Sequence, residues 1–292
     1  MNVVDSDVVE TKVQDIHSLT MHTNAVVERL KSDSHLDKVR GWLSPSDPST
    51  NLNAAKEKHH QGTGEWFINS NAFSEWKSGS RRHLWLHGLA GCGKTVLAST
   101  ILDHLRSALT ESCICLDFFF DFRDEKKQHL DNLLRSLASQ LYLHCAESQQ
   151  ELDGLFASCE SGQKQPTTGL LSKTVHLMMQ RPQKLQIVLD ALDECTTRSE
   201  LLRWMKTLSG SELKNTYLIA TSRREEELES RLSDWINKGN MIPMDKSLVN
   251  KDIRSYTRAR LRQGGEFQRR WGSSHGVLDD IESAIGGKSD GM

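Results

Sequence analysis

The feature that most constrains this chain is the segment GLAGCGKT, which runs from Gly88 to Thr95 and fits the pattern G-x-x-x-x-G-K-[ST]. Gly88, Gly91 and Gly93 allow the tight turns and close backbone approach that an anion cradled by N–H groups requires. Average residue usage would give this pattern by chance in about one chain in a hundred of this length. Because the pattern functions between a strand and a helix, it predicts a strand–loop–helix unit here.

Short apolar runs alternate with amphipathic segments on both sides of this loop. We expect strands over 84–87, 113–120, 185–189, 217–221 and 241–244. We expect helices over 94–109, 130–141, 169–180, 199–208, 225–238 and 249–263. This alternation predicts an α/β fold, a three-layer sandwich with helices on both faces of a parallel sheet and right-handed crossovers.

The chain before this domain reads differently. Residues 1–44 form an amphipathic pattern, with a mostly apolar stripe from Val13 to Leu30, and we expect a helical extension that docks on the domain or pairs as a coiled coil. Residues 45–62 are polar and contain Pro45 and Pro48, so we expect a linker there.

Composition excludes several classes of function. The formal net charge of −2 argues against a nucleic-acid partner. The start of the chain lacks the basic and apolar regions of a signal peptide, and no run of about 18 apolar residues predicts a membrane span. The six cysteines form no zinc-binding pattern. We therefore expect a soluble, cytoplasmic protein with reduced thiols.

The phosphate loop, as we call Gly88–Thr95, predicts a nucleoside triphosphate ligand, ATP or GTP, with Mg²⁺. Lys94 would place a cation against the β- and γ-phosphates, and the Thr95 hydroxyl would bind Mg²⁺. The dipole of the following helix adds to this attraction for phosphate. The remaining expected nucleotide-binding residues of this segment are Leu89, Ala90, Cys92 and Val96.

A magnesium nucleotide also needs acidic groups. Asp190 ends the apolar run of the third expected strand, and we expect it to hold Mg²⁺ directly or through water. Asp193 and Glu194 would orient or activate the attacking water. The alternative is that they only stabilise the N-terminus of a helix through its dipole. Arg223 follows the fourth expected strand and would stabilise charge on the γ-phosphate, or else pair with nearby carboxylates.

The three segments GLAGCGKT, IVLDALDE and LIATSRRE resemble those of NACHT domains, which are signal-transducing P-loop ATPases and GTPases. In this family an Asp is followed by a small residue, an apolar residue and Asp-Glu; here Ala191 stands where other P-loop ATPases often carry an acid. The segments TGEWF, FSEW and FFFDFR are similar to large fungal NACHT proteins, which include vegetative-incompatibility and innate-immunity-like receptors.

The resemblance carries expectations of its own. It implies the strand order 5-1-4-3-2, which places the strand of Arg223 between those of the phosphate loop and Asp190. It implies that Thr63 and Gly64 lie near the base and ribose. It assigns 63–246 to the NACHT domain, 247–292 to the start of a truncated helical subdomain, and the first 40 residues to a link from an effector.

The function implied is a nucleotide-dependent signalling switch with slow hydrolysis, conformational change and oligomerisation, whose partners are further copies or effector domains. One alternative is an active hydrolase that does mechanical or transfer work. The other is a nucleotide-free adaptor, against which the intact phosphate loop and acids speak. Cys92 departs from the family by placing a thiol in the loop, where it would be open to modification if exposed.

Overall fold

The computed structural model describes residues 33–58, 62–110 and 112–244, together with positions 17, 21, 252, 276 and 280. Among these, positions 17 and 21, residues 33–44 and Phe156–Gln165 belong to one compact unit, and the other described residues belong to a second one. In the smaller unit a helix covers 33–43, and the Trp42 indole N–H donates to the Lys164 carbonyl at 2.8 Å. The Trp42 ring also packs edge-on against Phe156, with centroids 5.3 Å apart.

The larger unit is built on a sheet of five parallel strands. They are β1 (His83–His87), β2 (Cys113–Phe119), β3 (Lys184–Asp190), β4 (Thr216–Ser222) and β5 (Met241–Pro243). Their order is β2-β3-β4-β1-β5, which read from the other edge is the expected 5-1-4-3-2. The central strands are buried on both faces, as apolar runs without alternation predict.

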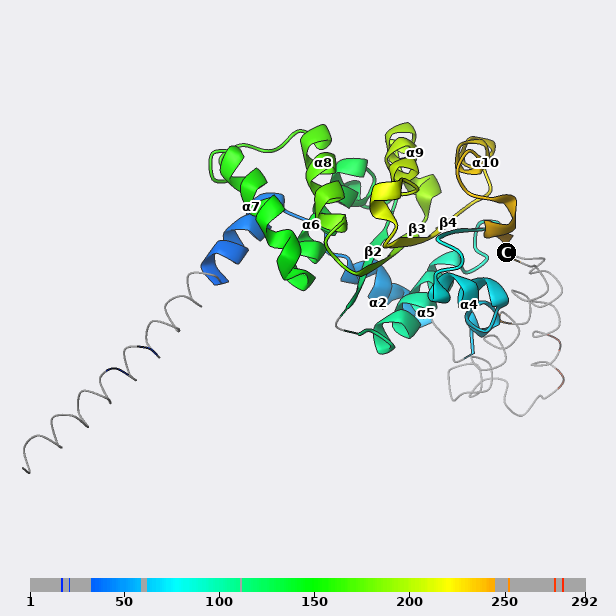
Figure 1. Cartoon of the computed structure of the whole chain (residues 1–292). Helices are drawn as coiled ribbons and strands as arrows, with labels where there is room; N and C mark the ends of the chain where they lie inside the picture. The colour runs from blue at the N-terminus through cyan, green and yellow to red at the C-terminus, as the bar shows by residue number, and fades with distance from the viewer. Residues whose placement is uncertain are drawn as a thin grey trace, which may run out of the picture. The chain divides into compact units, whose positions relative to one another are not determined.

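Helices cover both faces of this sheet. After the helix over 33–43, the helices of the described residues are α2 (Ser49–Lys58), α3 (Glu65–Ile68), α4 (Asn71–Ser78), α5 (Lys94–Ser107), α6 (Leu130–His144), α7 (Gln149–Ser158), α8 (Thr168–Met179), α9 (Arg198–Thr207) and α10 (Glu226–Ser233). The 3₁₀ turns are η1 (Glu125–Lys127), η2 (Ala146–Ser148), η3 (Leu192–Glu194), η4 (Ser211–Leu213) and η5 (Lys238–Asn240). Helices α2, α4 and α5 lie on one side of the sheet and α8, α9 and α10 on the other, which confirms the three-layer sandwich (Figure 1).

The segment 45–62, expected to be a linker, contains helix α2. The Asp47 carboxylate accepts the Ser49 N–H at 2.8 Å and starts the helix. Leu52 and Ala55 are its only buried residues, so its apolar face is too narrow to stand out in the sequence.

Two other helices differ from the expectations. Helix α7 is additional to the expected helices, and α10 ends at Ser233 rather than at 238. The apolar stripe over 13–30 and the helix expected over 249–263 lie outside the described residues.

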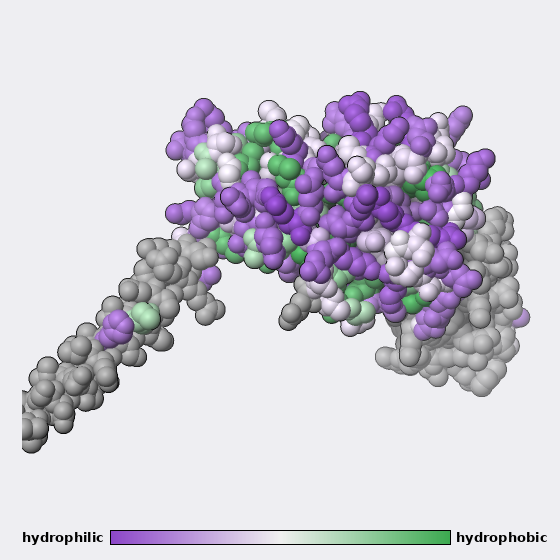
Figure 2. All heavy atoms as spheres, viewed as in Figure 1, coloured by the Kyte–Doolittle hydropathy of each residue, from purple (hydrophilic) through white to green (hydrophobic). Residues whose placement is uncertain are grey.

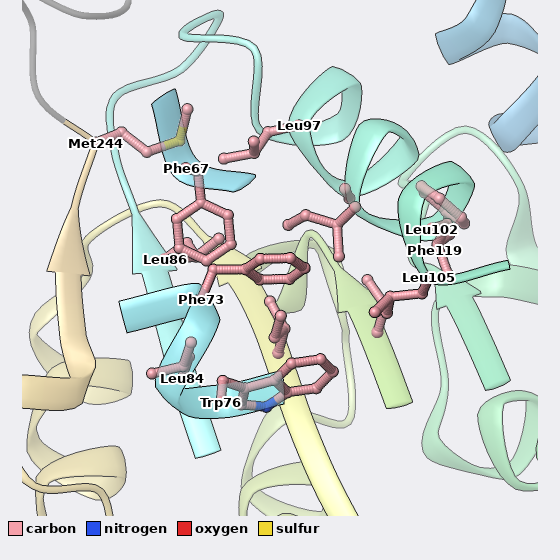
Figure 3. Packing of buried hydrophobic residues seen from close by; sticks show 14 of the residues in the cluster. Phe67, Phe73, Trp76, Leu84, Leu86, Leu97, Leu102, Leu105, Phe119 and Met244 are labelled. Atoms are coloured by element: carbon pink, nitrogen blue, oxygen red, sulfur yellow. The ribbon is translucent and has the colours of Figure 1, made fainter. Parts of the chain in front are cut away.

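An aromatic cluster holds α3 and α4 against the strand that leads into the phosphate loop. Phe67, Phe73 and Trp76 are buried, and the Phe73 and Trp76 rings stack with centroids 5.8 Å apart (Figure 3). The Trp76 indole N–H donates to the Leu218 carbonyl of β4 at 3.2 Å. These side chains pack with Leu84 of β1 in one cluster. Trp76 thus packs α4 onto the domain, beside the strand that leads into the phosphate loop.

The surface is predominantly polar on the face that Figure 2 shows. Within the described ranges, none of the helices combines the length and apolarity that crossing a membrane requires. All six cysteines are free thiols.

Candidate nucleotide-binding site

The phosphate loop joins β1 to α5 at the carboxyl edge of the sheet, where ligands of parallel α/β proteins bind. Gly91 and Gly93 adopt the left-handed conformation, with φ of 77° and 86°, which favours glycine at both positions. A Cβ on Gly88 would lie only 2.7 Å from the Cys92 sulfur. The turns and the close approach that the sequence pattern predicts are therefore present in the backbone.

Lys94 begins helix α5 and folds back over the loop. Its ammonium donates to the carbonyls of Gly88 at 3.1 Å and Leu89 at 2.7 Å. Gly93, the N-cap, has no side chain with which to bind the N–H groups of the first helical turn. These N–H groups and the Lys94 cation together form an anion-binding surface of the kind that phosphate requires.

Thr95 and Asp190 meet beside the loop. The Thr95 hydroxyl donates to one Asp190 carboxylate oxygen at 2.7 Å, and the Thr221 hydroxyl donates to the other. Asp190 is 1% exposed, and burial raises the pKa of its carboxyl, while the hydrogen bonds from Thr221 and Thr95 oppose that rise. A carboxylate and a hydroxyl at this separation suit Mg²⁺, which takes one or two protein oxygens and completes its shell with water and phosphate.

The next residues form what we call the acidic turn, Ala191–Glu194. Ala191 adopts the left-handed conformation with φ of 59°, and η3 follows it. One Asp193 carboxylate oxygen accepts the Arg223 N–H at 2.9 Å, and the other pairs with Arg223 Nε at 3.1 Å. The Asp193 side chain is 4% exposed, whereas that of Arg223 is 51% exposed. The structure thus brings these two expected residues together and pairs them with each other.

Glu194 also has a protein partner. Its carboxylate accepts the Phe122 N–H at 3.0 Å, from the loop that follows β2. Burial raises the pKa of this carboxyl, and the negative charges of Asp193, Asp121 and Asp190 raise it further, whereas the Phe122 hydrogen bond lowers it. Glu194 therefore links the acidic turn to the β2 loop rather than standing free.

Two cavities lie against the phosphate loop. The first, the polar cavity, has a volume of about 290 Å³, and its lining includes Lys94, Thr95, Asp190, Asp193, Glu194 and Arg223. The second, the apolar cavity, has a volume of about 270 Å³, and its lining includes Thr63, Gly64, Trp66, Cys92, Val96 and Met244. The structure therefore separates a region suited to phosphates and metal from a region suited to a base.

Residues that the sequence did not indicate complete both cavities. Asn51 and Lys58 come from α2, inside the segment expected to be a linker. Asp252 also lines the apolar cavity, and its carboxylate accepts the Gly64 N–H at 2.9 Å. The only sequence signal for α2 is the spacing of Leu52 and Ala55 after the Asp47–Ser49 cap.

Cys92 is not open to reagents in this structure. Its side chain is 5% exposed, and its sulfur lies 3.6 Å from the Met244 sulfur. Burial raises the pKa of the thiol, although the Lys94 charge opposes this. The condition for thiol sensitivity, exposure of Cys92, is therefore not met.

The chain is similar in sequence to a known protein family and to a known fungal protein. A family model described as "Nephrocystin 3, N-terminal" matches residues 62–223, more than half of the 292-residue chain. The chain is 22% identical over 242 residues to "Vegetative incompatibility protein HET-E-1" of Podospora anserina, and it spans 80% of its own length but 18% of that protein.

Two solved structures are also similar. Domain III of the Thermotoga maritima replication initiation protein DnaA gives a TM-score of 0.37 at 15% identity, covering 78% of this chain and 80% of that one. The Aeropyrum pernix ORC1 protein in complex with DNA gives 0.41 at 15% identity, covering 84% and 63%. On the family match, the chain belongs to the family described as "Nephrocystin 3, N-terminal", and its core is a NACHT-like P-loop NTPase domain.

Proposed function

We propose that this domain is a nucleotide-dependent signalling switch, which binds ATP or GTP with Mg²⁺, hydrolyses it slowly and changes conformation between nucleotide states. The observation that carries the proposal is the 2.7 Å contact between the Thr95 hydroxyl and the Asp190 carboxylate beside the phosphate loop. This contact places two oxygens of the kind that bind Mg²⁺ beside the Lys94 ammonium and the N–H groups of the first turn of α5.

The residues that line the two cavities would then have distinct roles. The Lys94 ammonium would exchange the carbonyls of Gly88 and Leu89 for β- and γ-phosphate oxygens, which carry formal charge and bind it more strongly. Thr95 and Asp190 would hold Mg²⁺, which neutralises charge on the phosphates when bound. In the apolar cavity, Thr63 and Gly64 would lie against the ribose and base.

The acidic turn supports slow rather than vigorous hydrolysis. Both acids that would orient water already bind protein groups, Asp193 with Arg223 and Glu194 with Phe122. Arg223 lines the polar cavity, so a γ-phosphate would compete with Asp193 for its guanidinium. This exchange would release the Asp193 carboxylate toward water and move the end of β4, which provides a physical link between the nucleotide state and conformation.

The biological role extends beyond the site. The chain spans 18% of the vegetative incompatibility protein that it resembles, and that protein's name indicates a response rather than a metabolic reaction. By this resemblance, we propose that the conformational change controls self-association or effector-domain contacts, and that the protein acts in the cytoplasm.

The test compares the Mg²⁺-triphosphate and diphosphate states of the purified chain. We expect single-turnover hydrolysis slower than about one per minute, within the range of unassisted switch GTPases. We also expect hydrogen exchange to differ between the two states at the end of β4 and in the acidic turn. Turnover faster than about one per second, with identical exchange in both states, would instead indicate a working hydrolase. Absence of nucleotide binding would indicate an adaptor.

A further inference from the structure

The polar and apolar cavities share one wall. Four residues line both: Lys58, Gly91, Gly93 and Val96. Three of these belong to the phosphate loop or to α5 just after it. Lys58 alone comes from α2, and it is the only charged side chain among the four. A nucleotide with its base in one cavity and its terminal phosphates in the other would pass Lys58 in between.

Helix α2 holds Lys58 at this position. The buried Lys127 ammonium, 2% exposed, donates to both Thr50 and Asn51 in the first turn of the helix. The Asn51 amide donates to the Asp121 carboxylate at 2.8 Å. Leu52 and Ala55 are buried in the middle of the helix. These contacts fix the helix along its length and leave its last residue beside the phosphate loop.

The two lysines of the last turn differ in their contacts. Lys56 pairs with Asp103 of α5 at 2.6 Å. Lys58 is exposed and makes no hydrogen bond or ion pair with any described residue. A lysine at a helix C-terminus can also remain solvated near the negative end of the helix dipole, and Lys56 already occupies that environment. Lys56 is therefore a matched control for any role of Lys58.

We propose that Lys58 is a second phosphate-binding cation, which contacts the α-phosphate of the bound nucleoside di- or triphosphate. Lys94 serves the β- and γ-phosphates, and the α-phosphate joins these to the ribose at the shared wall. Helix α2 thereby becomes part of the nucleotide-binding site, and bound nucleotide stabilises α2 against the phosphate loop. This inference rests on the proposed nucleotide binding.

The experiment measures dissociation constants of fluorescent ATP, ADP, GTP and GDP for wild type, Lys58→Gln, Lys58→Arg, Lys56→Gln and Lys94→Ala. We expect Lys58→Gln to weaken binding of the preferred di- and triphosphates by the same factor, three- to tenfold, because both carry the α-phosphate. Lys58→Arg keeps the charge and should bind within about twofold of wild type. Lys56→Gln should also bind like wild type, and urea unfolding checks that all variants are folded.

The outcomes separate this inference from the proposed function. If Lys94→Ala loses binding while Lys58→Gln binds like wild type, nucleotide binding stands and the role of Lys58 is wrong. If Lys56→Gln loses as much affinity as Lys58→Gln, the effect is general electrostatics and the inference is also wrong. If wild type binds none of the four nucleotides, both fail.

Discussion

The phosphate loop and the acidic turn lie side by side at one edge of the sheet, but their polar groups are held in different ways. Lys94 donates to carbonyls five and six positions away, within its own loop. Asp193 and Glu194 bind groups 30 and 72 positions away, just after β4 and in the loop after β2. The contacts of Lys94 are thus local, and a phosphate can replace them. The contacts of the acidic turn instead connect distant segments of the chain. We infer that the loop determines affinity and the turn determines rate.

The largest effect should follow from neutralising Asp193. The Asp193→Asn variant keeps an oxygen for the Arg223 N–H but removes the charge that orients water, so we expect single-turnover hydrolysis to slow about a hundredfold. Diphosphate affinity should stay within about twofold of wild type, because only a γ-phosphate would compete with Asp193 for Arg223. Glu229→Gln, which removes an acid paired with the neighbouring Arg224, serves as the control. If Asp193→Asn loses affinity instead of rate, the division between loop and turn is wrong.

An intermediate effect concerns His83, at the end of β1 away from the phosphate loop. There, a loss of stability at low pH could be mistaken for a loss of nucleotide binding. Burial lowers the pKa of His83 to about 4 from 6.5, with Arg82 contributing. Between these pH values the unfolded chain binds a proton at His83 and the folded chain does not, so stability falls as pH drops. We expect a loss of about 2 kcal/mol from pH 7 to pH 5.

Urea unfolding of wild type and His83→Leu at the two pH values measures this loss. The variant has no imidazole to titrate, so its unfolding free energy should fall by about 2 kcal/mol less than that of wild type. Equal losses in the two proteins would show that His83 is not the group responsible. Nucleotide affinities should then be compared at pH 7, where His83 is neutral in the folded state and mostly neutral in the unfolded state.

The smallest effect concerns the backbone of the loop. Gly88→Ala would place a Cβ 2.7 Å from the Cys92 sulfur, so we expect at least tenfold weaker nucleotide binding, or about 1.4 kcal/mol. Cys92→Ala alone should bind within about threefold of wild type. The double variant should recover part of the affinity, because the clash with the Cys92 sulfur is removed and the Met244 Cβ at 3.2 Å is the closest remaining atom. Equal weakening in the single and double variants would mean that the contact with Cys92 is not the cause.

The difference between the two regions also explains what the sequence could predict. The phosphate loop, the strand ending in Asp190 and the strand order follow from local patterns and from the family resemblance. The pairing of Asp193 with Arg223 depends on how β3 and β4 lie together; of the two roles considered for Arg223, the structure shows the contact with a nearby carboxylate. Helix α2 has no clear sequence signal because only Leu52 and Ala55 of it are buried, while its contacts with Lys127 and Asp121 come from distant segments.

The central claim, that the phosphate loop binds a nucleoside triphosphate, is tested most directly by labelled ATP and GTP binding in the presence of Mg²⁺. Wild type, Lys94→Ala and the exposed-surface control Lys173→Ala should be measured together. We predict micromolar or tighter binding of at least one nucleotide by wild type and the control, and at least a tenfold loss in Lys94→Ala, about 1.4 kcal/mol. Equal affinity in wild type and Lys94→Ala, or no binding by wild type, would contradict the claim.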